Sequence, residues 1–234
     1  MKRLVHVQAH RGASKERPEN TVESVLLAAE IGVDSIEIDV QVLKDGTPIL
    51  FHDFELPGQG YITSYTLEEV SQLSLLSEVL KSLKNPIPDS QSPLLDIELK
   101  YAHTQSKGPT REFILENVLS VVARESSERR VVYRSFDWEI LKLLLKKHPE
   151  CQVIPLVSEK EKNWDEILDW KTQWIAPSIQ NLKSDWIEKA QAQNTKIMAY
   201  TANSIPEWER LITIGVEGIT TDYPRELIQF LKTK

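Results

Sequence analysis

Segments typical of a β-strand alternate with segments typical of an amphipathic helix along almost the whole chain. Strands that are joined through helices pair in parallel, because the helix must carry the chain back to the start of the next strand. The strand-like runs are residues 3–9, 34–42, 92–100, 129–135, 152–157, 172–177, 196–201 and 218–223. Eight such units in 234 residues predict an α/β fold, a closed (β/α)8 barrel.

The helix-like runs carry their own end signals. In "NTVESVLLAAEIG" Asn20 is expected to cap a helix, Glu23 to complete a capping box and Gly32 to end it. Further helices are expected at about 110–127, 136–148, 163–170, 182–194, 205–214 and 224–232.

One strand-like run breaks the alternation. Only Lys44, Asp45 and Gly46 separate "TPILFHD" from the preceding strand, which is the spacing of a hairpin and not of a helical crossover. A turn centred between Lys44 and Asp45 would place His52 opposite Glu37. We therefore expect a β-hairpin extension that brings a histidine back to the second barrel strand.

Composition favours one domain over residues 1–234, without a linker or an internal repeat. Hydrophobic residues make up 41% and no apolar run approaches the roughly 20 residues of a membrane span, so no stable membrane insertion is expected.

The N-terminus lacks the apolar core of a signal peptide, which predicts a cytoplasmic protein. The single Cys151 excludes an internal disulfide and is expected to be a buried strand thiol. A net charge of −7 argues against nucleic acid as partner but allows a small anionic substrate.

Carboxylates cluster on two of the predicted strands. Glu37 and Asp39 are two apart, so they share the inward face, and Glu98 shares a face with Asp96 and Lys100. Inward carboxylates require a compensating cation, and an all-oxygen set suits one divalent cation, either Mg²⁺ or Ca²⁺. The alternative is a set of ion pairs inside the barrel, for example Glu98 with Lys100.

Histidines and fixed cations are predicted at the same rim. His10 and His52 follow two strands that flank the carboxylates, and unperturbed imidazoles exchange protons near neutral pH. Arg11 and Lys100 could contact a phosphate. Together with a metal, these groups describe a site for phosphodiester chemistry.

The chain resembles the glycerophosphodiester phosphodiesterase family over nearly its whole length. The resemblance lies in "AHRGASKERPENTVESV", "GVDSIEIDVQVLKDGTPILFHD", "LLDIELK", "AYTANS" and "GVEGITTDYP". It implies a distorted TIM barrel and metal-dependent hydrolysis of small-molecule glycerophosphodiesters to glycerol 3-phosphate and an alcohol. By this resemblance His10 and His52 are the acid/base pair, in either order, Glu37, Asp39 and Glu98 the metal ligands, and Arg11 and Lys100 the phosphate contacts.

The sequence departs from the family pattern at two places. Tyr200 stands where the family usually has Trp, so we expect an aromatic substrate contact with an added hydroxyl. The insertion at about 53–66 is short and lacks the usual Arg and Thr residues, which leaves the alcohol group open. Two alternative functions are hydrolysis of lysophospholipids and noncatalytic phosphoester binding. For Asp222 a structural hydrogen bond and a site contact are both considered, and for Glu19 orientation of Arg11 and a role at the helix entry.

Overall fold

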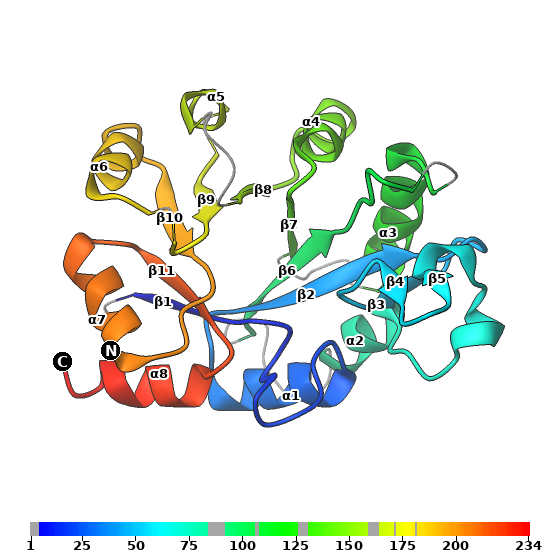
Figure 1. Cartoon of the computed structure of the whole chain (residues 1–234), viewed down its shortest axis with the longest axis horizontal. Helices are drawn as coiled ribbons and strands as arrows, with labels where there is room; N and C mark the ends of the chain where they lie inside the picture. Colours follow the sequence, from blue (N-terminus) through cyan, green and yellow to red (C-terminus); the bar gives the residue numbers. More distant parts are fainter. Residues whose placement is uncertain are drawn as a thin grey trace.

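The computed structural model describes residues 5–83, 92–105, 108–125, 131–158, 164–170, 172–180 and 182–234, and it confirms the barrel (Figure 1). Each barrel strand pairs in parallel with its neighbours, and the last strand pairs with the first, so the sheet is closed. The barrel strands are β1 (His6–Ala9), β2 (Ser35–Val42), β6 (Leu94–Leu99), β7 (Val131–Ser135), β8 (Val153–Val157), β9 (Trp174–Pro177), β10 (Lys196–Ala199) and β11 (Gly218–Thr221).

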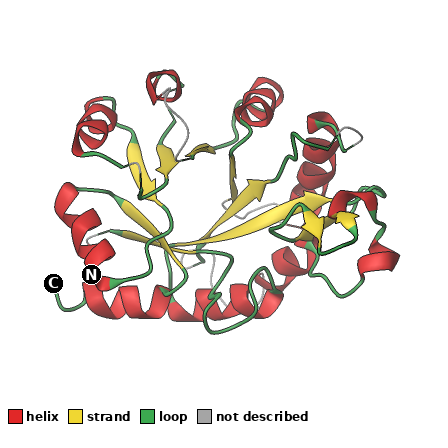
Figure 2. Cartoon of the chain, in the orientation of Figure 1, coloured by secondary structure: helices red, strands yellow, loops and turns green. Residues whose placement is uncertain are grey.

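Helices form the outer layer around these strands (Figure 2). They are α1 (Val22–Ile31), α2 (Leu76–Leu83), α3 (Arg111–Glu125), α4 (Trp138–Lys147), α5 (Trp164–Leu168), α6 (Ser184–Ala192), α7 (Ile205–Ile214) and α8 (Pro224–Leu231). Helix α2 was not predicted. It supplies the crossover between β2 and β6, and its buried Leu76, Val79, Leu80 and Leu83 pack into the main core. None of the helices that the structure describes is long and apolar enough to cross a membrane.

The inside of the barrel has a polar half and an apolar half. Apolar side chains fill it along β8 to β10 and at Val132 of β7, where Val132, Ile154, Leu156, Ala176 and Met198 form one buried cluster. On the side of β1, β2, β6 and β11 the buried interior is polar instead. The apolar Ile36, Ile38 and Val40 of β2 belong to the main cluster with the helices, while Glu37 and Asp39 alternate with them and share the other face, as predicted.

The hairpin forms as predicted, but the predicted register differs by one residue from the observed one. Strand β3 (Pro48–Leu50) pairs antiparallel with β2 and sets Leu50 opposite Val40. The loop has three residues, because the Leu43 N–H donates to the Thr47 carbonyl at 3.0 Å, and Gly46 adopts the left-handed φ of 87° that such a loop requires. If this pairing is continued two residues beyond Leu50, His52 lies opposite Ile38 and not opposite Glu37.

The predicted cap of α1 is also wrong by one residue. Thr21 is the N-cap and accepts from the Ser24 backbone N–H at 3.2 Å, while Ser24 completes the capping box in place of Glu23. Asn20 is used elsewhere: it has a left-handed φ of 56° and its amide binds Asp39. Gly32 ends the helix as expected, with φ of 80°.

The segment after β3 folds over the end of the barrel where β2 and β6 finish. It contains β4 (Glu55–Leu56), β5 (Gly60–Tyr61) and two short 3₁₀ helices, Ile62–Ser64 and Leu67–Val70. It is fastened to the loop after β6, since the Tyr61 hydroxyl lies 2.9 Å from Thr104 Oγ1 and Thr63 Oγ1 donates to Gln105 Oε1 at 2.7 Å.

Cys151 differs from the expectation. It is half-buried in the bend before β8 and is not part of the strand. Burial, with the neighbouring charge of Glu150, raises the pKa of its thiol.

Candidate functional site

Three buried carboxylates meet where β2 and β6 approach their C-terminal ends. Asp39 and Glu98 are register partners, and Glu37 lies one inward position earlier on β2. Each of the three offers an oxygen within 4.8 Å of the others, and none of the three is more than 8% exposed. The structure therefore brings together the acidic residues that the sequence predicted.

The donor chemistry of this cluster fits a divalent cation. Glu37 Oε2 accepts the backbone N–H of Arg11 at 2.9 Å, but Glu37 Oε1 is buried and has no hydrogen-bond partner. A buried carboxylate oxygen without a partner is costly unless a cation satisfies it. An all-oxygen set is the kind that Mg²⁺ and Ca²⁺ prefer.

The predicted cations lie against the same carboxylates, so the ion pairs considered as an alternative are present as well. Lys100 Nζ is 3.0 Å from Glu98 Oε1 and 3.4 Å from Asp39 Oδ1, and Arg11 Nε is 3.2 Å from Asp39 Oδ2. Burial raises the pKa of Asp39, but Lys100 and Arg11 outweigh it and the net shift is downward. Burial and the charge of Asp39 raise the pKa of Glu37 to about 8.

Arg11 is held in place by the loop that it begins. Its Nη1 donates to both carboxylate oxygens of Glu19, at 2.9 and 3.0 Å, which supports the role of Glu19 in orienting Arg11. Arg11 and Gly12 both have left-handed φ values, 57° and 79°. A Cβ on Gly12 would collide with Ser24, so the turn after β1 requires glycine.

His10 follows β1 and is bound to an aspartate. Its Nδ1 lies 2.6 Å from Asp222 Oδ1, and both side chains are 21% exposed. Burial lowers the pKa of His10, but the hydrogen bond to Asp222 and the nearby charge of Glu37 outweigh it, so the net shift is upward. Asp222 is thus a site residue as well as a structural one.

His52 follows β3 and has a similar but more exposed arrangement. Its Nδ1 lies 2.8 Å from Asp53 Oδ1, and the two side chains are 38% and 71% exposed. The charge of His52 acts on Asp39, whereas that of His10 acts on Glu37. The two imidazoles therefore border different members of the acidic cluster.

A cavity of about 340 Å³ adjoins the cluster on the His52 side. Its lining includes His52, Phe54, Glu98, Lys100, Tyr101 and Phe136. Tyr200 packs edge to face against Phe136 with ring centroids 6.0 Å apart, and its hydroxyl donates to the Val157 carbonyl at 3.0 Å. The added hydroxyl of Tyr200 is thus bound to the backbone.

Sequence reasoning did not identify Asn20 as a residue of the site. The Asn20 side chain donates to Asp39 Oδ2 at 2.8 Å and accepts the Asp39 backbone N–H at 3.0 Å, so it fixes that carboxylate. The signal was the polar residue in "PENT" next to Glu19, which we assigned to the helix cap.

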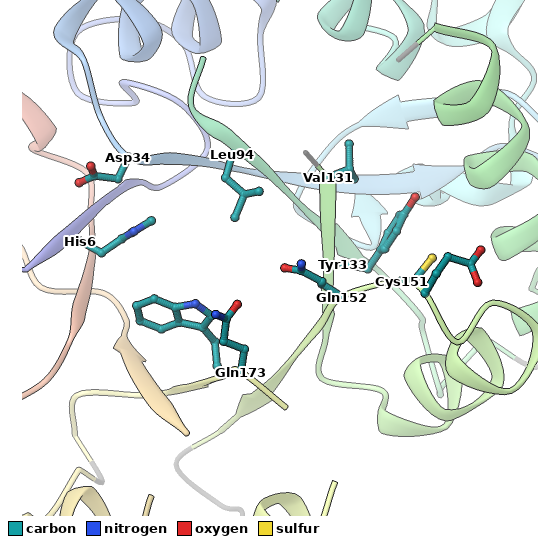
Figure 3. Close-up of a pocket in the computed structure, with 10 residues that line it drawn as sticks. His6, Asp34, Leu94, Val131, Tyr133, Cys151, Gln152 and Gln173 are labelled. Carbon is teal, nitrogen blue, oxygen red and sulfur yellow. The ribbon is translucent and has the colours of Figure 1, made fainter. Parts of the chain in front are cut away.

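A larger cavity of about 570 Å³ opens at the other end of the barrel (Figure 3). His6, Leu94, Gln152 and Trp174 line it near the N-terminal ends of their strands. The acidic cluster found among the described residues lies at the opposite end, where active sites of (β/α)8 barrels form. We therefore assign the functional site to the end of the barrel that holds the acidic cluster, next to the smaller cavity.

Comparisons with known proteins agree with this geometry. The model of the glycerophosphoryl diester phosphodiesterase family matches residues 10–226. A glycerophosphodiester phosphodiesterase of Caldanaerobacter subterraneus subsp. tengcongensis is 29% identical over 97% of each chain.

Two solved structures share the fold. A glycerophosphodiester phosphodiesterase from Parabacteroides distasonis has a TM-score of 0.85 and 25% identity, covering 100% of this chain and 99% of its own. A phosphodiesterase from Oleispira antarctica, solved in complex with the product sn-glycerol-3-phosphate, has a TM-score of 0.85 and 24% identity, covering 98% of this chain and 97% of its own.

Proposed function

The chain belongs to the glycerophosphoryl diester phosphodiesterase family and is a phosphodiesterase, and we propose that it hydrolyses glycerophosphodiesters to glycerol 3-phosphate and an alcohol. One observation carries this proposal: three buried carboxylates, two aspartate-bound histidines and two cations meet at one end of the barrel. Because β11 must pair with β1 to close that barrel, we also propose that residues 1–234 act as one domain.

Glu37, Asp39 and Glu98 would hold one divalent cation, Mg²⁺ or Ca²⁺. When bound, such a cation withdraws negative charge from the phosphate oxygens. Arg11 and Lys100 add fixed positive charge beside the same carboxylates, and the Arg11 guanidinium is oriented by Glu19 before a diester arrives. These groups would bind and orient the phosphate.

The two histidines would transfer the protons. One removes a proton from the nucleophile, either water or the glycerol 2-hydroxyl, and the other protonates the leaving alkoxide. Asp222 and Asp53 each occupy an Nδ1 atom, so Nε2 is the nitrogen left to face the diester at both positions. Because His10 lies next to Glu37 and His52 next to Asp39, one imidazole would serve the entering oxygen and the other the leaving oxygen.

A lysophospholipid is the second candidate substrate, and one observation favours it. Phe136 is 47% exposed and lines the cavity together with Phe54 and Tyr101, which gives an aromatic path from the site to the surface. Such a surface is suited to an acyl chain. If this substrate is preferred, Phe136→Ser will lower kcat/KM for lysophosphatidylcholine and leave that for glycerophosphocholine unchanged.

The main proposal is tested by release of glycerol 3-phosphate from glycerophosphocholine and glycerophosphoethanolamine. We expect release that depends on Mg²⁺ or Ca²⁺, disappears with EDTA, and is lost in His10→Ala and His52→Ala. The matched control is His148→Ala, because His148 caps the C-terminal end of α4 and is 43% exposed. Phosphate-analogue binding without release of any product from diesters or lysophospholipids would contradict the proposal and favour a noncatalytic binding protein.

A further inference from the structure

The orientation of His10 depends on Asp222, and Asp222 is itself held by Asn203. The Asn203 side-chain amide donates from Nδ2 to Asp222 Oδ2 at 2.7 Å. In the other direction, the backbone N–H of Asp222 donates to Asn203 Oδ1 at 2.9 Å. Since one bond uses the amide as donor and the other as acceptor, neither the amide nor the carboxylate can rotate without loss of a hydrogen bond.

Asn203 is in turn anchored to the start of helix α7. Its backbone N–H donates to Glu207 Oε2 at 2.8 Å, and the Ser204 hydroxyl donates to the same oxygen at 2.9 Å. Glu207 lies in the first turn of α7. On the other side, Thr221 Oγ1 donates to Asn203 Oδ1 at 3.2 Å. The amide therefore joins the loop after β10 to the end of β11.

Asn203 lies outside the chemistry itself. It belongs neither to the acidic cluster nor to the residues that line the 340 Å³ cavity, and its connection to His10 passes through the Asp222 carboxylate. Asp222 accepts from Asn203 through Oδ2 and binds His10 through Oδ1. A shift of the Asn203 amide would therefore move the oxygen that binds the imidazole. On the premise of the proposed function, we propose that Asn203 is a positioning residue that keeps Asp222, and through it the His10 imidazole, oriented for proton transfer.

The first test is kinetic and uses the whole chain with its metal. Asn203→Ala is expected to lower kcat for glycerol 3-phosphate release by about tenfold to a hundredfold with little change in KM, as for other groups that orient a catalytic side chain. Asn203→Asp is expected to lose more, because it places a second carboxylate against Asp222. The matched control is Asn117→Ala, a half-buried asparagine in α3 whose amide donates to the Phe113 carbonyl at 2.8 Å.

A double-mutant cycle separates positioning from general destabilisation. If Asn203 acts through Asp222, Asn203→Ala should cause no further loss in an Asp222→Ala background, which keeps the His10 imidazole and a measurable residual release. Equal losses in both backgrounds, or a kcat that is unchanged in the single variant, would overturn the proposal. Melting temperatures of all variants are measured beside kcat, and Glu207→Gln, which keeps an acceptor for the Asn203 N–H, should retain most activity.

A spectroscopic measurement decides the proposal independently of turnover. The His10 Nδ1 proton, identified by its loss in His10→Ala, should resonate downfield in the proton NMR spectrum because it is donated to a carboxylate. We expect Asn203→Ala to shift or broaden this resonance and Asn117→Ala to leave it in place. An unchanged resonance in Asn203→Ala would refute positioning even if the enzyme is active. Failure of the wild-type protein to turn over any diester would instead refute the proposed function alone.

Discussion

At the scale of the residue, Glu37 is a buried carboxyl that lies beside another negative charge. One of its oxygens is buried without a hydrogen-bond partner, and the charge of Asp39 lies beside it. The sequence predicted this pair because the side chains of a strand alternate between its faces. It did not predict Asn20 as the residue that holds Asp39, because an asparagine before a helix satisfies the rules for a cap equally well.

Replacement of the uncompensated carboxylate should abolish stabilisation by metal. Saturating Mg²⁺ or Ca²⁺, at about 100 times the dissociation constant, should stabilise the wild-type protein by about 2.7 kcal/mol, whereas Glu37→Gln should show almost no effect of either ion. Glu37→Gln should fold, because a neutral amide carries no charge to desolvate. Thermal denaturation with metal or EDTA measures both proteins, with Glu150→Gln as control. An equal metal effect in Glu37→Gln would contradict the assignment.

Metal binding should also release a proton from Glu37. With its pKa raised to about 8, this carboxyl is mostly protonated at pH 7, while the cation requires the ionised form. The apparent metal affinity should therefore rise by about tenfold per unit between pH 6 and 7, and level off above pH 8. Calorimetric titration in two buffers of different ionisation enthalpy counts the protons. A buffer-independent enthalpy at pH 7 would show that Glu37 is already ionised.

At the scale of the element, the barrel strands could be predicted because each is a short apolar run bounded by helix signals. Errors arose where a tertiary contact decided the outcome. The Asn20 side chain binds Asp39 and does not cap α1. The three-residue loop that ends at Gly46 shifts the register of the hairpin by one residue from the predicted one. Helix α2 follows a segment of two short strands and two 3₁₀ helices, so no regular alternation of strand and helix marked its start.

The tight turn between β1 and α1 makes a prediction about glycine. In Gly12→Ala the alanine must adopt a left-handed φ, and its Cβ would also collide with Ser24. In Gly58→Ala the alanine must adopt a left-handed φ too, but no atom lies within 4 Å of its Cβ. Strained φ alone costs about 1–2 kcal/mol, and crowding adds about 1–3 kcal/mol. Urea denaturation should show a larger loss for Gly12→Ala than for Gly58→Ala. Equal losses of unfolding free energy in the two variants would mean that Ser24 can move away from the added Cβ at no energetic cost.

At the scale of the whole molecule, the polar part of the barrel interior places further buried charge beside the acidic cluster. Arg134 and Asp96 are 2% and 0% exposed and form an ion pair inside the barrel, where Asp96 is the register partner of Glu37 and Arg134 that of Glu98. Gln8 joins them, because its Nε2 donates to Asp96 at 2.9 Å and its Oε1 accepts from Arg134 at 2.7 Å. The sequence marked Asp96 as inward but gave no signal that Arg134 would be its partner, since strands β6 and β7 meet only in the folded sheet.

Removal of this buried guanidinium should therefore cost far more than removal of an exposed one. Arg134→Leu leaves Asp96 as an uncompensated buried charge and should lower the free energy of unfolding by about 3–5 kcal/mol. Arg225, which pairs with Glu16 and is 44% exposed, is the control, and Arg225→Leu should lower the free energy of unfolding far less, because solvent screens an exposed ion pair. The double variant Arg134→Leu with Asp96→Leu should recover part of the loss, because it removes the stranded charge together with its partner. Urea denaturation compares the four proteins. If Arg134→Leu were no worse than Arg225→Leu, water would have to reach Asp96, and the polar half of the barrel would be hydrated rather than held by its own side chains.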